Sequence, residues 1–284
     1  MIPKHVREKV IADFNSVYSF RTKDTLTENI SRIARKSGDN DFKFQNSLPI
    51  SQSGYYEYDL EKSLEQISIS TNQNSCIYLK LVQRKSTKSE LAIRISAPLS
   101  YIIIELVCED ESQLSLYTYC DGVSYLDLNT IVQANSKFTS THCEWSKQTI
   151  VSSYSTTLVN KNSKVETISY HLSPIKSQLY HEGIIIAKPQ AQKCIAEERL
   201  IGVLGDSTSI LFLEPVLDIS SATCLSSHTC SLLHLTQEQE QYAKSRGINS
   251  LRDHMFMSSL DVFLGSIPDQ LQVFKQEVLS LEKH

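Results

Sequence analysis

Two cysteines, a serine and a histidine occupy alternate positions near the end of the β-rich part of the sequence: Cys224, Ser226, His228 and Cys230. Alternate residues of a strand share one face, so this spacing would present the four side chains together. Thiolate and imidazole are good ligands for iron and zinc. Neighbouring positions on one face lie about 6.5–7 Å apart, so one ion would need long reaches or a ligand from a partner. We expect His228 to be the main metal-ligand candidate, flanked by Cys224 and Cys230.

The other cysteines and histidines favour structural roles. The chain has seven cysteines, an odd number, and no CxxC pair, which disfavours a disulfide framework. We expect Cys194 to be a buried strand residue. His142 and Cys143 lie beside Trp145 without a suitably spaced partner, and we interpret them as structural.

Enzyme signatures are absent from the sequence. It contains no GxxxxGK[ST] phosphate-binding loop, so we expect no ATP hydrolysis by this chain. The GxSxG and HExxH patterns are also missing. These observations predict a non-enzymatic protein.

The composition is that of a folded protein, with 284 residues of which 40% are hydrophobic and 21% charged. The net charge of −4 and the pI near 6.1 disfavour a nucleic-acid or membrane-surface binder. No apolar run approaches the roughly 18 residues of a membrane span. The N-terminus lacks the apolar core of a secretory signal, so we expect a cytoplasmic protein.

Hydrophobic periodicity divides the chain into three parts. Residues 1–54 begin with a helical pattern, including Val6, Val10 and Phe14, and continue as an irregular polar connection. Residues 55–235 alternate apolar and polar residues in short strands without crossover helices, which leaves a sandwich, a barrel or a β-helix. Tight hairpin signals are scarce, Asp121-Gly122 being the only Asp-Gly pair, and this mildly favours stacked coils.

Residues 236–284 return to a helical period and predict a small helical subdomain. Thr236 and Gln239 have the spacing of a capping box, and Gly247 is placed to end the first helix. A second helix should follow from Leu251, and Pro268 suits the start of a third.

Several blocks of this C-terminal part resemble the SufD family of iron–sulfur cluster assembly proteins. They follow one another in the family's order and spacing: AQKCIA at 191–196, EPVLDI at 214–219, SSHTCS at 226–231 and QEQEQYAKSRGI at 237–248. The residues that match the family signature are Gln192, Lys193, Ser245, Arg246 and Gly247. Upstream, His171 and Pro174 with Ser177 are similar to another family stretch, whereas the N-terminal region is shorter than the family's.

The resemblance implies a right-handed parallel β-helix core with a short N-terminal helix and a C-terminal helical subdomain. It also implies a scaffold subunit of the SUF system that pairs with a SufB-like subunit through its β-helix and carries no ATPase motif. The SufC ATPase would bind the C-terminal helices, with the candidate contacts Met255, Phe256, Leu260, Phe263 and Leu264.

His228 matches the family's histidine at the SufB interface, whereas the family's cysteine two residues earlier is Ser226 here. We expect no stably bound cofactor, but transient iron or a nascent cluster at that interface. Three alternatives stay open: a SufB-like subunit, a degenerate paralogue that only docks, and a β-helix carbohydrate-active enzyme or adhesin. Thr229, where a SufB-like chain would carry glutamate, favours the SufD-like reading.

Overall fold

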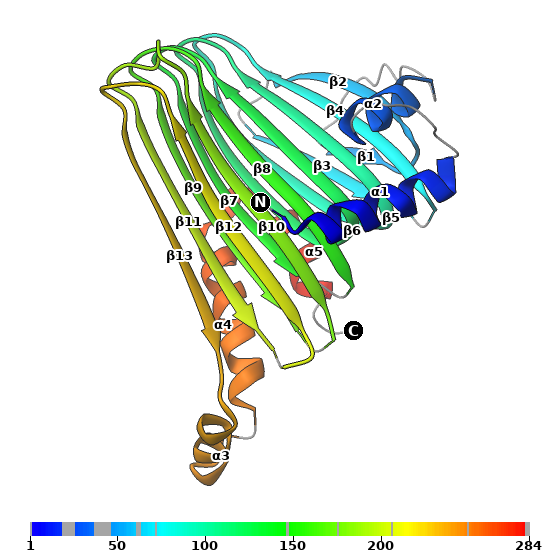
Figure 1. The fold of residues 1–284 in the computed structure, drawn as a ribbon. Helices are drawn as coiled ribbons and strands as arrows, with labels where there is room; N and C mark the ends of the chain where they lie inside the picture. Colours follow the sequence, from blue (N-terminus) through cyan, green and yellow to red (C-terminus); the bar gives the residue numbers. More distant parts are fainter. Residues whose placement is uncertain are drawn as a thin grey trace.

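The computed structural model describes residues 2–18, 26–36, 47–60, 64–71, 73–145, 148–174, 176–205, 207–248 and 250–281. Most of them form a parallel β-helix, in which the chain winds repeatedly through two facing β-sheets (Figure 1). We call one circuit of the chain a rung, and about seven rungs are stacked. The prediction of a mainly β protein with a parallel β-helix core is confirmed.

Strands of the two sheets alternate along the chain, and every pairing is parallel. Sheet A contains β1 (Ser47–Ile50), β3 (Leu64–Ser70), β7 (Lys137–Trp145), β9 (Lys164–Ser173), β11 (Ile195–Leu204) and β13 (Leu225–His234). Sheet B contains β2 (Gly54–Leu60), β4 (Ser75–Gln83), β8 (Thr149–Leu158), β10 (Gln178–Ala187) and β12 (Ile210–Ile219). The long strands β5 (Lys88–Cys108) and β6 (Gln113–Val132) run through both sheets.

Inward-facing residues form columns that continue from rung to rung. One column of sheet A contains Ile95, Cys120, Glu144, His171, Gly202 and Leu232. One column of sheet B contains Ile77, Ile102, Leu126, Ser152, His181 and Leu213. Both columns are apolar or thiol-bearing in the early rungs and become polar in the same two rungs, those of β7 to β10. The apolar interior therefore gives way to a buried polar cluster there.

The connections from sheet B back to sheet A are tight and stacked. Five of them have one residue in the left-handed region, with φ between 56° and 62°: Ser86, Glu111, Asn135, Asn162 and Lys193. The amides of the first four donate to a carbonyl of the next connection, as from Asn162 N to Gln192 O at 2.9 Å, whereas the Lys193 amide donates to Thr223 Oγ1 at 2.9 Å. The Asn162 side chain also donates to Asn135 Oδ1 at 3.0 Å. Lys193 of the family signature thus lies in an exposed, stacked turn.

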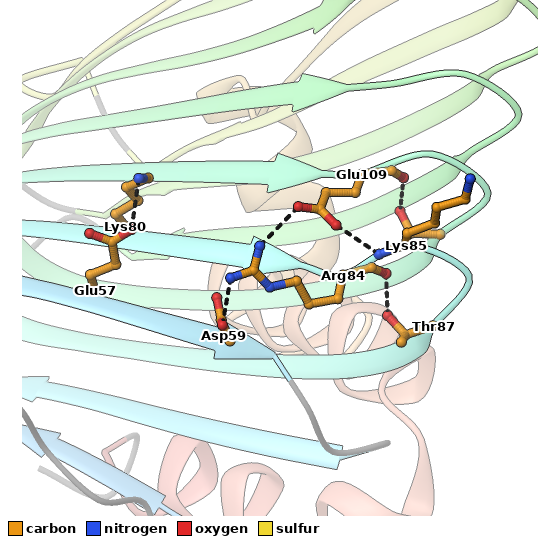
Figure 2. A network of polar contacts seen from close by, with 8 residues as sticks. Glu57, Asp59, Lys80, Arg84, Lys85, Thr87 and Glu109 are labelled. Carbon is orange, nitrogen blue, oxygen red and sulfur yellow. Dashed lines mark hydrogen bonds and ion pairs between the residues drawn. The ribbon is translucent and has the colours of Figure 1, made fainter.

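Charged side chains tie the early rungs together at the same edge. Arg84 bonds to Asp59 of the preceding rung at 2.6 Å and to Glu109 of the following rung at 3.0 Å (Figure 2). The second carboxylate oxygen of Glu109 accepts the amide of Lys85 at 2.9 Å. All three charged side chains are at least one third exposed, so solvent weakens these ion pairs. They align neighbouring rungs more than they stabilise the folded protein.

Helices cover the outer faces of both sheets. α1 (Lys4–Tyr18) and α2 (Leu26–Lys36) pack on sheet B, where Phe14 meets Tyr101 with ring centroids 4.9 Å apart. α4 (Leu251–Ser266), a short 3-10 turn (Asp269–Leu271) and α5 (Gln272–Leu281) pack on sheet A. α3 (Gln237–Ser245) extends beyond the sheets (Figure 1). Among the described residues, no helix is both long and apolar enough to cross a membrane.

The ends of the β-helix differ in detail from the expected boundaries. The first strand begins at Ser47 rather than near Tyr55, and α2 lies within the segment predicted to be irregular. Residues 19–25 and 37–46 of that segment lie outside the described residues. At the C-terminal end the capping box is present, because Thr236 Oγ1 accepts the Gln239 amide and the Gln239 side chain accepts the Thr236 amide.

Candidate functional site

The last rung of the β-helix is open. β13 pairs with β11 on one side and, within the described part of the chain, with no strand on the other. All ten of its residues are exposed, including Leu225 (70%) and Leu232 (55%). β12 ends sheet B in the same way, since its one partner among the described strands is β10. Figure 1 shows β13 as the outermost strand. An open strand edge offers unpaired N–H and C=O groups to another chain.

The predicted metal-ligand set is only partly brought together. Ser226, His228 and Cys230 lie on β13 at alternate positions and share a face, as predicted. Cys224 precedes the strand and packs partly against the hydrophobic core, near Cys194. Four residues of extended chain span about 13 Å, so Cys224 and His228 cannot bind one ion. The structure thus places Cys224 one residue before the strand that carries the other three side chains.

Glu198 of β11 is a site residue that sequence reasoning missed. It is the register partner of His228, so the two α-carbons lie about 4.8 Å apart and both side chains project to the same face. Glu198 is only 3% exposed, and its Oε2 has no hydrogen-bond partner in the part of the chain that the structure describes. Burial raises its pKa to about 7. The signal in the sequence was its position between Ala196 and Leu200 on the apolar face of a strand.

Carboxyl, imidazole and thiol groups therefore lie on one face at the open end, on adjacent strands. Burial, and secondarily the charge of Glu198, raise the pKa of the Cys230 thiol. Cys230 is thus protonated at neutral pH and not a reactive thiolate as it stands. A divalent iron or zinc ion suits this donor set, because the ion would displace the protons from both Glu198 and Cys230.

Glu198→Gln should stabilise the isolated protein at high pH. The folded-state pKa of Glu198 lies above its usual value of 4.5, so folding loses stability as the pH rises from about 4.5 through 7. Removing the charge should raise the free energy of unfolding by roughly 2–4 kcal/mol at pH 8.5 and by much less at pH 5. Urea unfolding at the two pH values measures the difference.

Glu197→Gln is the matched control, because Glu197 lies on the outward face of the same strand and is partly exposed. Its effect should stay within about 0.5 kcal/mol at both pH values. Equal changes in the free energy of unfolding for Glu198→Gln at pH 5 and pH 8.5 would show that burial does not raise the pKa of Glu198.

Residues of the family signature mostly shape the backbone. Gly247 has φ of +85° and follows α3, where a left-handed residue ends a helix. The Arg246 guanidinium lies over the Tyr242 ring at 5.3 Å, and Ser245 Oγ donates to the Tyr242 carbonyl at 2.7 Å. Gln192, like Lys193, lies in the stacked turn before β11.

Four of the five predicted ATPase contacts on α4 are buried within this chain. Phe256, Leu260, Phe263 and Leu264 are at most 8% exposed, because they pack on the outer face of sheet A against residues such as Tyr119 and Tyr170. Only Met255 remains partly exposed. The outward apolar residues of this region are instead Tyr242, Ile248 and Val262, which are 44–62% exposed. A shallow groove beside them is lined by Leu233, Leu235, Leu251, Met255 and Val262.

Comparison of the sequence with protein-family models finds no match, and comparison with curated proteins finds none either. The likeness to SufD proteins therefore depends on the blocks between residues 191 and 248 and on the helical pattern that follows them.

Proposed function

We propose that this protein is a non-ATPase scaffold subunit of the SUF iron–sulfur cluster assembly system. It pairs with a SufB-like subunit through the open end of the β-helix and docks the SufC ATPase through its C-terminal helices. We place it in the cytoplasm, where the reducing environment keeps its seven unpaired cysteines in the thiol form.

The observation that carries the proposal is the uncovered edge of β13. Ten consecutive residues are exposed there, although the strand is regular and fully paired with β11. Long uncovered edges invite aggregation, and proteins usually blunt them with charges or cover them. No residue of β13 is Lys, Arg, Asp or Glu. A strand of a second β-helix would extend the sheet and bury Leu225 and Leu232.

The chemistry at this edge supports an assembly role. Glu198, His228 and Cys230 supply a carboxylate, an imidazole and a thiol from one side of the expected interface. His228 and Cys230 lie about 6.5–7 Å apart along the strand, so a bound iron ion would be completed by groups of the partner. Iron or a nascent cluster is the cargo of such a site, held only while the two subunits are paired.

The ATPase would bind the exposed surface formed by α3 and α4. Tyr242 and Val262 are exposed apolar side chains, and the groove between α4 and the end of β13 adds Leu233 and Leu251. A helix of the partner suits such a groove. The groove borders β13, so movement of the ATPase could be transmitted to the subunit interface.

Co-purification tests the proposal. The wild-type chain, co-expressed with SufB-like and SufC-like proteins, should retain both. The double variant Tyr242→Ala, Val262→Asp should lose the ATPase alone, because neither residue is buried in the fold. Val273→Asp on α5, 61% exposed, is the matched control and should retain both partners. Retention of neither partner by the wild-type chain would reject the scaffold role.

The same experiment separates the alternatives. A degenerate docking paralogue would retain the ATPase but not the SufB-like subunit. A SufB-like subunit would pair with a SufD-like protein instead. A carbohydrate-active enzyme or adhesin would retain neither.

A further inference from the structure

A buried polar cluster lies inside the β-helix, beneath the open end. Its members are Glu144 at the end of β7, His171 at the end of β9 and His181 at the start of β10. All three are 0% exposed. One ligand atom from each residue lies within 4.8 Å of the others, and the two imidazole centroids are 4.1 Å apart. Neither Glu144 nor His181 was singled out by sequence reasoning, because the residues are far apart along the chain.

The hydrogen bonds fix the tautomer of each histidine. Glu144 accepts three bonds: from Tyr154 Oη at 2.5 Å, from Ser152 Oγ at 3.0 Å and from His171 Nδ1 at 3.0 Å. The Ser152 hydroxyl has a single hydrogen, which it donates in the hydrogen bond to Glu144. His181 Nδ1, 2.8 Å from Ser152 Oγ, must therefore be the donor in the second hydrogen bond. Both Nδ1 atoms therefore carry hydrogen, and in the neutral rings both Nε2 atoms carry lone pairs.

These two Nε2 atoms are buried and have no hydrogen-bond partner among the described residues. Buried polar atoms without partners are rare in native proteins and call for an explanation such as an ion. Metal-binding histidines characteristically donate their other ring nitrogen to a carboxylate or a hydrogen-bonded neighbour. His171 donates to Glu144 directly, and His181 donates to it through Ser152.

We propose that His171 and His181 bind one divalent transition-metal ion through their free Nε2 atoms, with Glu144 as the carboxylate that orients the His171 ring from its Nδ1 side. Imidazole nitrogen is a good ligand for zinc and iron(II). Glu144 supplies the negative charge and holds the His171 ring in place. This site does not depend on the proposed scaffold role.

The surrounding residues favour a permanent ion over transported cargo. Gly202 and Leu213 follow His171 and His181 in their columns toward the open end. A side chain at Gly202 would clash with Leu211, Leu213 and Leu232, whose ends lie within 2.7–3.1 Å of the position of its Cβ. These leucines separate the cluster from the open end. The ion would enter during folding and remain, as in structural metal sites.

Metal analysis of refolded protein tests the site. Wild-type protein unfolded with chelator and refolded with Co²⁺ should retain about one cobalt per chain after dialysis, with visible d–d absorption and without the thiolate charge-transfer band of a cysteine ligand. The double variant His171→Asn, His181→Asn keeps a donor near each Nδ1 but removes both Nε2 atoms. It should retain none.

Two controls locate the ion. His142→Asn changes another buried histidine, bonded to Thr118, and should leave cobalt binding unchanged. His228→Ala with Cys230→Ser removes the open-end ligands and should also leave it unchanged. Wild-type protein that retains no cobalt would overturn the site and leave only the Glu144–His171 hydrogen bond. Equal retention by the double asparagine variant would overturn it as well.

Discussion

Glu144→Ala should lower the free energy of unfolding by roughly 3–5 kcal/mol at pH 7 in metal-free protein. The substitution leaves three buried donors without an acceptor: Ser152 Oγ, Tyr154 Oη and His171 Nδ1. Each unpaired donor costs roughly 1–3 kcal/mol, and relaxation of the cluster recovers part of the sum. Urea unfolding in the presence of chelator measures the loss.

The loss should depend on pH. Burial alone would raise the pKa of Glu144, but the hydrogen bonds and charges around it, chiefly from His171, lower it to about 2. The stabilisation by Glu144 is therefore fully present above about pH 4.5 and disappears as the pH falls toward 2. The difference between wild type and variant should narrow over that range.

Two variants calibrate the result. Tyr154→Phe removes one of the three donors and should cost roughly 1.5–3 kcal/mol. Glu166→Ala alters an outward, partly exposed carboxylate on β9 and should stay within about 0.5 kcal/mol. A loss below about 1 kcal/mol for Glu144→Ala would mean that this carboxylate does not organise the interior.

Prolines at Ser226 and Leu232 should weaken binding of the SufB-like subunit by at least about 30-fold. The Leu225 amide donates toward β11, to Cys194 O at 2.8 Å. Backbone groups alternate sides along a strand, so the amides of 226, 228, 230 and 232 point to the open edge. The two prolines remove two of these donors while sparing the bonds to β11. Isothermal titration of the purified subunits measures the change.

The matched control is Ser226→Ala with Leu232→Ala, which alters the same side chains and keeps both amides. Its affinity loss should be less than tenfold, and both variants should show wild-type circular dichroism. Equal losses in the two variants would indicate side-chain contact without strand pairing.

The main features of the fold could be predicted from local sequence patterns. Period-two alternation from Ile67 onward places inward residues on successive strands, and the scarcity of hairpin signals favoured stacked rungs. The helix ends at Thr236 and Gly247 were predictable because capping depends on neighbouring residues. The first strand at Ser47 was missed because it is short, and four residues carry little periodicity.

The sites were less predictable because they depend on register between distant strands. His228 and Cys230 could be placed on one face from their spacing alone. Glu198 could not be paired with His228 without knowing that β11 and β13 align over a separation of 30 residues. The cluster of Glu144, His171 and His181 needs the register of two strand pairs and the corner between the sheets. Spacing on α4 likewise could not show that Phe263 faces sheet A.

The most direct test of the scaffold role is hydrogen–deuterium exchange along β13, measured on the free chain and after addition of a SufB-like subunit. Strand pairing predicts that the backbone amides of residues 226, 228, 230 and 232 exchange quickly in the free protein and become strongly protected in the complex, while α1 is unaffected. A stable complex that leaves the exchange of β13 unchanged would contradict pairing through the open end of the β-helix.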